Sequence, residues 1–313
     1  MQKDSRIYLA GHSGMVGAAV FRHLTASGYT NIYTAPHGYP NLRSQDDVTR
    51  LFAAIQPEYV FLCAAKVGGI IANSTYPAEF IYQNLQIQTN IINACRPELG
   101  PLGVKRLLFL GSSCIYPRAA SQPIRESDLM TGPLEPTNEP YAMAKLAGIS
   151  MCRAYRKQYG MDSVCLMPTN LFGPRDRSDH LVPDLMRKMT AAKKAGATEV
   201  ILLGTGTPKR ELMHVDDLAR ACVYFMNGPD VRDIVNIGTG HDMSVSDIAA
   251  EVADVVGYQG KIRWDHDAPD GTPRKVLDVS RAYALGWYHT IGLREGLERT
   301  YREAYPTDAA RSY

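Results

Sequence analysis

Residues 7–17 read IYLAGHSGMVG, a short apolar run that passes directly into a turn with three glycines. The residues that follow have the pattern of an amphipathic helix, which we expect from Met15 to Ser27. A strand, a glycine turn and a helix in this order form the first unit of a parallel α/β sheet. This stretch therefore sets the fold class, and the chain after it repeats the same alternation.

Short β-branched or apolar runs alternate with longer helical patterns as far as Pro168. The expected strands are Ile7–Ala10, Asn31–Thr34, Tyr59–Ala64, Arg106–Leu110 and Ser163–Met167, and the expected helices are Met15–Ser27, Gln45–Ile55, Ala78–Cys95 and Tyr141–Tyr159. Such alternation predicts an α/β fold with a doubly wound parallel Rossmann sheet. In such a sheet, the functional groups gather at the carboxyl ends of the strands.

The pattern changes beyond Asn170, where a smaller C-terminal lobe is expected to begin. We expect a helix over Leu181–Ala195, short strands around Val200 and Ile234, and a helix that Ser244 opens with a capping box and that ends at Val256. The sequence thus predicts a Rossmann domain over residues 1–170 and a lobe over residues 171–313. Some Rossmann elements are expected to return from the second part.

The composition bounds the possible functions. A chain of 313 residues with a formal net charge of +2 carries too little charge to suggest a nucleic-acid or membrane partner. No secretory h-region precedes the first strand, so we expect a cytoplasmic protein. The six cysteines lack zinc-ligand or disulfide spacing, so no metal site is expected. Long helices with apolar content beyond the need of one sheet face favour a homodimer.

The glycine turn is suited to a dinucleotide. Its glycines, Gly11, Gly14 and Gly17, are each separated by two residues, and they let the backbone approach a pyrophosphate, whose charge the helix N-terminus stabilises. The second strand ends at residues 33–37 (YTAPH) without an acid that would bind a ribose 2′-hydroxyl. NADP(H) is therefore favoured over NAD(H), although no arginine for the 2′-phosphate stands there either.

A second motif can handle protons. Tyr141 and Lys145 stand four residues apart, so they share one helix face, where the ammonium can stabilise a phenolate. Ser112 follows the strand that ends at Leu110 and can polarise a carbonyl. A phenol that donates its proton while a hydride arrives acts as a general acid. The glycine turn, the serine and the Tyr-x-x-x-Lys pair together indicate a short-chain dehydrogenase.

Longer motifs narrow the assignment. Several stretches resemble the GDP-L-fucose synthase family of the extended short-chain dehydrogenases: residues 64–70 (AAKVGGI), 110–117 (LGSSCIYP), 134–142 (LEPTNEPYA), 167–171 (MPTNL), 206–211 (GTPKRE), 214–217 (HVDD) and 269–275 (PDGTPRK). The likeness covers nearly the whole chain. It implies an enzyme that epimerises C3 and C5 of GDP-4-keto-6-deoxymannose and then reduces C4 with NADPH, in one site.

The resemblance also implies the residues of that site. Ser112, Tyr141 and Lys145 serve reduction, and Cys114 with His180 serves epimerisation. The implied cofactor contacts are Gly11, His12, Ser13, Gly14, Met15, Val16, Gly17, Ala65, Leu110, Gly111, Tyr141, Lys145, Pro168, Asn170, Leu171 and His180. The implied contacts of the GDP-sugar, in the C-terminal lobe, are Lys188, Leu203, Arg210, Asp270 and Lys275.

Taken alone, several of these residues have simpler interpretations. Cys114 also fits a small core residue, His180 a solvated helix start, and Lys188 with Lys275 ordinary surface charges. The motif at 214–217 is expected to order a turn, with Asp216 or Asp217 capping the next helix.

Three features depart from the family pattern. The loop from Pro174 to His180 is short, Leu203 stands where a tryptophan is usual, and Ser13 replaces an arginine that meets the cofactor's 2′-phosphate. These changes concern the fit of substrate and cofactor more than the type of reaction.

Two other functions compete with this interpretation. A nucleotide-sugar 4-epimerase or 4,6-dehydratase shares the fold and the Tyr/Lys pair. A dehydratase, however, needs an acidic pair after the serine, where Ser113 and Cys114 stand, and a 4-epimerase leaves Cys114 and His180 without a role. A non-catalytic NADP sensor needs neither Tyr141 nor Lys145.

Overall fold

The computed structural model describes residues 1–306 except 36–39, 98–102, 177–178 and 269. Its main sheet has six parallel strands in the order β2-β1-β3-β4-β5-β9. The strands are β1 (Ile7–Ala10), β2 (Ile32–Tyr33), β3 (Tyr59–Leu62), β4 (Arg106–Leu110), β5 (Ser163–Pro168) and β9 (Ile234–Ile237). The predicted doubly wound parallel sheet is thus confirmed.

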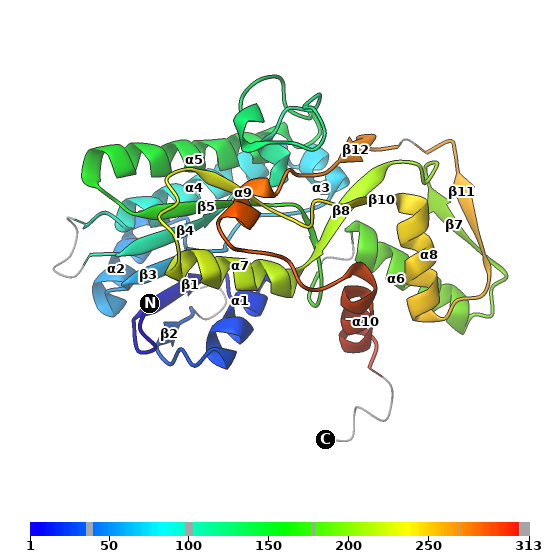
Figure 1. The fold of residues 1–313 in the computed structure, drawn as a ribbon, viewed down its shortest axis with the longest axis horizontal. Coiled ribbons are helices and arrows are strands. Elements are labelled where there is room, and N and C mark those ends of the chain that lie inside the picture. The colour runs from blue at the N-terminus through cyan, green and yellow to red at the C-terminus, as the bar shows by residue number, and fades with distance from the viewer. Residues whose placement is uncertain (36–39, 98–102, 177–178, 269, 307–313) are drawn as a thin grey trace.

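Helices cover both faces of this sheet (Figure 1). On one face lie α1 (Met15–Ala26) and α7 (Val215–Asn227), and on the other lie α2 (Gln45–Ile55), α4 (Pro77–Ala94) and α5 (Glu139–Tyr159). Strand residues alternate between the two apolar layers: Ile7 and Leu9 pack toward α1, whereas Tyr8 and Ala10 pack toward α2 and α4. This alternation buries both faces of the sheet.

A second apolar core lies beyond the carboxyl ends of these strands. It packs α6 (Leu181–Lys194), α8 (Val245–Val256) and α10 (Leu293–Ala304) around β7 (Glu199–Leu203) and β11 (Lys261–Asp265). Between the two cores, β8 (Lys209–His214) pairs with β6 (Asn170–Phe172), β10 (Asp242–Ser244) and β12 (Arg274–Lys275). Short helices α3 (Ile70–Thr75) and α9 (Ser280–Ala284) complete the fold.

Two expectations about the second half need correction. The strand near Ile234 is not part of the smaller lobe: β9 pairs with β5, with Cys165 opposite Ile234, and α7 packs against α1. β9 and α7 are thus elements of the kind that was expected to return from the second part to the main sheet.

Neither Asp216 nor Asp217 caps α7. The cap is His214, whose Nδ1 accepts a hydrogen bond from the Asp216 N–H at 3.3 Å. Asp217 is fully buried and instead accepts backbone N–H groups from Thr290 and Ile291. By contrast, the predicted capping residue of α8 is confirmed, since Ser244 Oγ accepts from the Asp247 N–H at 3.1 Å.

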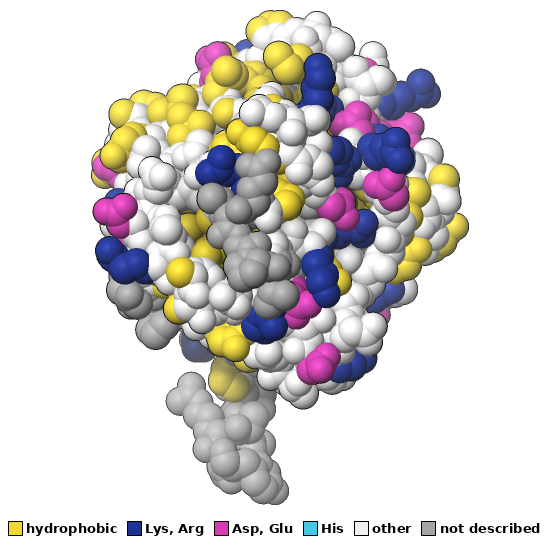
Figure 2. Space-filling model, turned by 90° about the vertical axis from the view of Figure 1, so that its left-hand side faces the viewer, with side chains coloured by type: hydrophobic (Ala, Val, Ile, Leu, Met, Phe, Trp, Pro, Cys, Tyr) yellow, Lys and Arg dark blue, Asp and Glu magenta, His cyan; other side chains and the backbone are white. Residues whose placement is uncertain are grey.

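Charges of both signs share the surface. On the face shown in Figure 2, Lys and Arg side chains lie next to Asp and Glu. Ion pairs such as Arg106–Asp162 and Lys105–Glu58 hold segments that are far apart in the sequence. Among the helices of the described ranges, none combines the length and the apolar character needed to cross a membrane.

Candidate active site

The glycine turn lies where β1 and β3 end. Gly11 has φ +89°, and a Cβ there would stand 2.6 Å from the backbone nitrogen of Ala64. A Cβ on Gly17 would stand 2.0 Å from the Gly11 carbonyl oxygen. Both positions therefore require glycine: a side chain at Gly11 would clash with the backbone that follows β3, and one at Gly17 would push α1 away from the turn.

The start of α1 is left open for an anion. Gly14 is the N-cap and supplies no side-chain cap, and the first turn carries no acidic residue. The backbone N–H groups at this end are not used within the helix, and they point the positive end of its dipole at the turn. His12 and Ser13 form the crest of the turn, and Met15 and Val16 begin the helix. The site thus fits the pyrophosphate of a dinucleotide.

The other predicted cofactor residues lie at the same edge of the sheet. They are Ala65 after β3, Leu110 and Gly111 at the end of β4, Pro168 at the end of β5, and Asn170 and Leu171 in β6. A Cβ on Gly111 would stand 2.4 Å from the end of the Met167 side chain, which would have to move to make room for it. The stretch after β2 is described only at Thr34 and Ala35; Pro36 and His37 lie outside the described residues.

Tyr141 and Lys145 share one face of α5, as their spacing predicts. The ammonium of Lys145 lies 5.8 Å from the centre of the Tyr141 ring and 5.2 Å from that of Phe109. It donates a hydrogen bond of 2.8 Å to the carbonyl oxygen of Leu110, at the end of β4. This bond fixes α5 against the strand that leads to Ser112.

Burial dominates the electrostatics of the pair. It raises the pKa of Tyr141, as does the nearby Cys114, while a hydrogen bond from Ser112 opposes the rise. Burial lowers the pKa of Lys145 from 10.5 to about 8, against a small opposite effect of Cys63. At neutral pH the phenol therefore keeps its proton, which is the state that a general acid needs.

Cys114 stands beside this pair. It lies in a 3₁₀ turn, Ser113–Ile115, which follows Ser112; the Ser112 hydroxyl accepts the Cys114 N–H at 3.2 Å. Two donors approach its sulfur, Asn138 Nδ2 and Lys275 Nζ, each at 3.5 Å. The structure thus brings Tyr141 and Lys275, which are distant in the sequence, to the segment that carries Ser112 and Cys114.

His180 is the N-cap residue of α6. Its Nδ1 lies 2.6 Å from Asp176 Oδ1, and the adjacent Asp179 accepts the Gly69 N–H at 2.9 Å. The second contact joins the start of α6 to the Gly-Gly turn that follows β3. Of the short loop that precedes His180, residues 177 and 178 lie outside the described residues.

The residues expected to bind the nucleotide lie on the second lobe. Arg210 on β8 pairs in register with Lys275 on β12 and donates to the Thr272 carbonyl at 2.6 Å. Burial lowers the pKa of Arg210, and the charge of Asp270 opposes this effect. Lys188 on α6 forms an ion pair of 2.8 Å with Asp184.

Asp270 and Leu203 have different surroundings. Asp270 accepts the Thr205 N–H and hydroxyl, and chiefly the side-chain bond holds its pKa below the usual range. Leu203, the last residue of β7, is 65% exposed, so its side chain is available to a ligand.

Sequence reasoning missed two residues that build the site. Glu211 is fully buried and accepts the backbone N–H groups of Thr239, Gly240 and Leu277 at 2.5–2.8 Å. It holds the segment that carries Lys275 against β8. Asn138 was read only as part of a motif, and its contact with Cys114 had no signal in the spacing.

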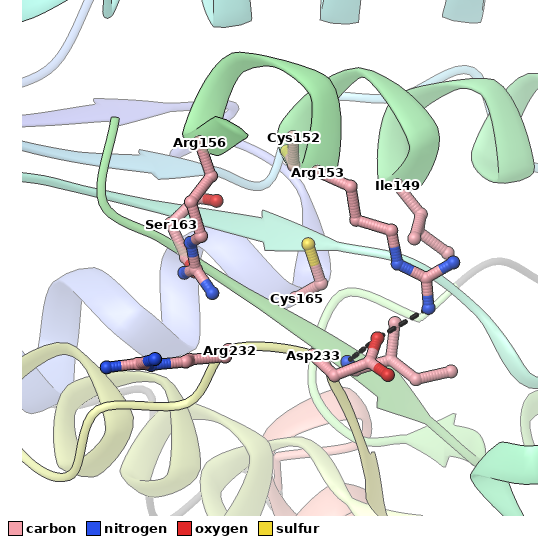
Figure 3. A pocket seen from close by; sticks show the side chains of 9 residues that line it. Ile149, Cys152, Arg153, Arg156, Ser163, Cys165, Arg232 and Asp233 are labelled. Atoms are coloured by element: carbon pink, nitrogen blue, oxygen red, sulfur yellow. Dashed lines mark hydrogen bonds and ion pairs between the residues drawn. The ribbon is translucent and has the colours of Figure 1, made fainter. Parts of the chain in front are cut away.

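A small pocket lies away from these candidate site residues. It lies where β5 and β9 begin, between Cys152, Cys165 and the ion pair of Arg153 with Asp233 (Figure 3). Its volume of about 10 Å³ has room for one water molecule at most. This pocket is therefore too small for a substrate, and it lies at the edge of the sheet opposite to Ser112.

Comparisons with known proteins agree with these features. A model of the NAD dependent epimerase/dehydratase family matches residues 7–238. The chain is 50% identical over 304 residues to probable GDP-L-fucose synthase 1 of Oryza sativa subsp. japonica, covering 96% of this chain and 92% of the relative. It is 47% identical over 310 residues to GDP-L-fucose synthase of Escherichia coli (strain K12), covering 95% of each.

A solved structure resembles the whole fold. GDP-mannoheptose C4 reductase from Campylobacter jejuni, with NADP bound, superposes with a TM-score of 0.89 at 34% identity, covering 97% of this chain and 99% of that one.

Proposed function

The chain belongs to the NAD dependent epimerase/dehydratase family and, within it, to the GDP-L-fucose synthases, and from this membership we infer that it makes GDP-L-fucose from GDP-4-keto-6-deoxymannose. It is an NADP(H)-dependent enzyme that combines epimerisation at C3 and C5 with reduction at C4. One observation connects this function with particular residues: the thiol of Cys114 lies beside Tyr141, the phenol that reduction requires.

Reduction is assigned to Ser112, Tyr141 and Lys145. Bound NADPH supplies a hydride to C4 of the keto sugar. Tyr141, protonated because burial raises its pKa, donates its proton to the C4 oxygen. Ser112 polarises the same oxygen, and Lys145, fixed to the Leu110 carbonyl, compensates the charge left on the phenol. These roles explain why the three side chains meet at the end of β4.

Epimerisation is assigned to Cys114 and His180. A C–H bond next to the ketone breaks, its proton moves to one of the two side chains, and the electron pair delocalises onto the C4 oxygen as an enolate. Ser112 and Tyr141 hold that oxygen, so the same donors serve both reactions. A proton returned to the other face of the ring inverts the carbon. Support comes from the position of the Cys114 sulfur beside Tyr141 and from the Asp176 contact, which fixes the His180 ring.

The GDP moiety is assigned to the second lobe. Arg210 and Lys188 supply charge to the diphosphate, and the planar guanidinium suits bidentate binding. Asp270 is assigned to hydroxyl groups of the nucleotide sugar, and Leu203 offers an exposed apolar surface in place of an aromatic ring. Lys275 contacts the Cys114 sulfur, which favours a place near the reacting sugar.

Direct assay tests this function. Purified protein with NADPH and GDP-4-keto-6-deoxymannose should consume NADPH, measured by absorbance, and should yield a product that co-elutes with GDP-L-fucose. Consumption of NADPH with a product that is not inverted at C3 and C5 would identify a plain 4-reductase instead.

Three further properties belong to the same proposal. We propose a nucleotide-binding domain over residues 1–170, to which β9 and α7 return from the second part, with a substrate-binding lobe over the rest of 171–313, assembly as a homodimer, and residence in the cytoplasm. Exposed apolar side chains on neighbouring helices support pairing, for example Tyr82 on α4 and Met143 on α5. Light scattering should give twice the 34.5 kDa of one chain; a value near 34.5 kDa at micromolar concentration would contradict the dimer.

A further inference from the structure

The side chain of Asn138 does not cap α5, although the residue stands at the N-cap position. Asn138 is the N-cap of α5, a place where asparagine is preferred because its oxygen accepts a helix N–H. Here the side chain makes no such bond. Its Nδ2 lies 3.5 Å from the sulfur of Cys114, 24 residues earlier in the chain. The amide therefore faces the thiol and leaves the helix end without its usual cap.

The oxygen of the Asn138 amide also indicates that the side chain is oriented toward Cys114. The Oδ1 of Asn138 is buried and has no hydrogen-bond partner among the described residues. Buried polar atoms are nearly always paired, and exceptions in native structures concentrate where function constrains a side chain. An uncapped helix start and an unpaired oxygen are two local costs, and both arise from the orientation that brings the N–H group toward Cys114.

The sulfur has two donors within reach. Lys275 Nζ and Asn138 Nδ2 each lie 3.5 Å from it. Donors of this kind fix the direction of the lone pairs of the sulfur. Lys275 contributes a charge on a flexible stem, whereas Asn138 is held by the first turn of α5, three residues before Tyr141. The amide can therefore fix the sulfur relative to the phenol.

We propose that Asn138 is a positioning residue for epimerisation, whose side-chain N–H holds the sulfur of Cys114 in line with the ring carbons of the keto sugar. The inference rests on the proposed function, in which the C–H bond next to the ketone breaks and its proton moves between carbon and sulfur. In this role Asn138 acts through the sulfur of Cys114 and not by direct contact with the sugar or the cofactor. Its loss should slow proton exchange at the ring and leave hydride transfer nearly intact.

Two substitutions separate this role from helix capping. Asn138→Asp keeps the shape and is a favourable N-cap residue, but it replaces the N–H donor by an oxygen that repels the lone pairs of the sulfur. Asn138→Ala removes the donor, and it removes no cap from α5, because the wild-type side chain makes no capping bond. Ser244→Ala, at the N-cap of α8, is the control for the loss of a helix cap away from Cys114.

Two rates are compared for each protein. Incubation with NADP⁺ and GDP-4-keto-6-deoxymannose in D₂O gives deuterium incorporation at C3 and C5. Stopped-flow absorbance with NADP⁺ and GDP-L-fucose gives hydride transfer in the reverse direction, which precedes any epimerisation. We expect Asn138→Asp and Asn138→Ala to lose 10- to 100-fold in exchange, the effect of one charge-assisted hydrogen bond. Hydride transfer should change less than threefold, and the KM for the keto sugar should not change.

The outcomes are distinct. If Asn138→Asp keeps the wild-type ratio of exchange to hydride transfer, or if both rates fall in proportion as in a merely destabilised protein, the positioning role is wrong. If the wild-type protein shows neither exchange nor hydride transfer with these sugars, the proposed function itself fails. Ser244→Ala should keep the wild-type ratio.

Discussion

Replacing Lys145 by methionine should make the protein more stable at neutral pH while abolishing reduction. The Lys145 side chain is 5% exposed, and burial lowers its pKa from 10.5 to about 8. That difference of about 2.5 units corresponds to about 3 kcal/mol against the charged form. Below pH 8 the amine is charged in both states, so the folded protein carries the whole cost. Between pH 8 and 10.5 the unfolded chain binds a proton that the folded protein has released, so stability rises with pH.

Methionine removes the charge and keeps a similar length. It also leaves the Leu110 carbonyl without its 2.8 Å hydrogen bond, at a cost of about 1 kcal/mol. Lys145→Met should therefore be about 2 kcal/mol more stable than wild type at pH 7 and should lose this advantage at pH 10. Urea unfolding of the cofactor-free proteins at both pH values measures the difference. The control Lys157→Met, exposed on the same helix, should show no such change with pH.

One result would contradict this prediction for Lys145. Destabilisation of Lys145→Met by the same amount at pH 7 and pH 10 would mean that the buried amine carries no cost as a cation.

Other outcomes follow from the same geometry. Gly17→Ala should weaken NADPH binding at least 10-fold, because its Cβ would lie 2.0 Å from the Gly11 oxygen, whereas Gly292→Ala, with nothing within 4 Å, should bind normally in a fluorescence titration. NADPH should give a higher kcat/KM than NADH, since no acid follows Thr34 before residue 38; equal values at matched salt would refute this. Glu211→Gln should lower the free energy of unfolding, measured in urea, by about 3 kcal/mol, because an NH₂ group replaces one of the two oxygens that accept buried backbone N–H groups. A loss below 1 kcal/mol would contradict the structural role of Glu211.

The strands and helices expected up to Met167 could be predicted from the sequence to within two residues, whereas helix α10 and strands β6, β8, β10, β11 and β12 were not among the expected elements. Strand Arg106–Leu110 and helix Gln45–Ile55 have the predicted bounds, since each is a single unbroken pattern between turn residues. The pair Tyr141 and Lys145 was also predictable, because helix geometry alone puts residues four apart on one face.

Long-range contacts could not be predicted in this way. The contact of Lys275 with Cys114 spans 161 residues, and no local pattern encodes it. The cap of α7 was assigned to an aspartate because aspartate is the commoner cap. The helix begins earlier than that preference suggests: α7 starts at Val215, so both aspartates lie within its first turn and His214 occupies the N-cap. Asp217 accepts the N–H groups near Thr290 instead.

The central claim is that two sets of proton-handling groups share one site: Cys114 with His180 for ring protons, and Tyr141 with Lys145 for hydride transfer. The most direct test measures deuterium incorporation at C3 and C5 and NADPH consumption with the keto sugar in D₂O. Tyr141→Phe should still incorporate part of the deuterium, yet consume NADPH about 10²- to 10⁴-fold more slowly, which is the loss expected when a general acid is removed. Cys114→Ala should do the converse, with little exchange and residual reduction. Loss of exchange and reduction in the same proportion in both variants would contradict the account, since one shared acid/base would then serve every step.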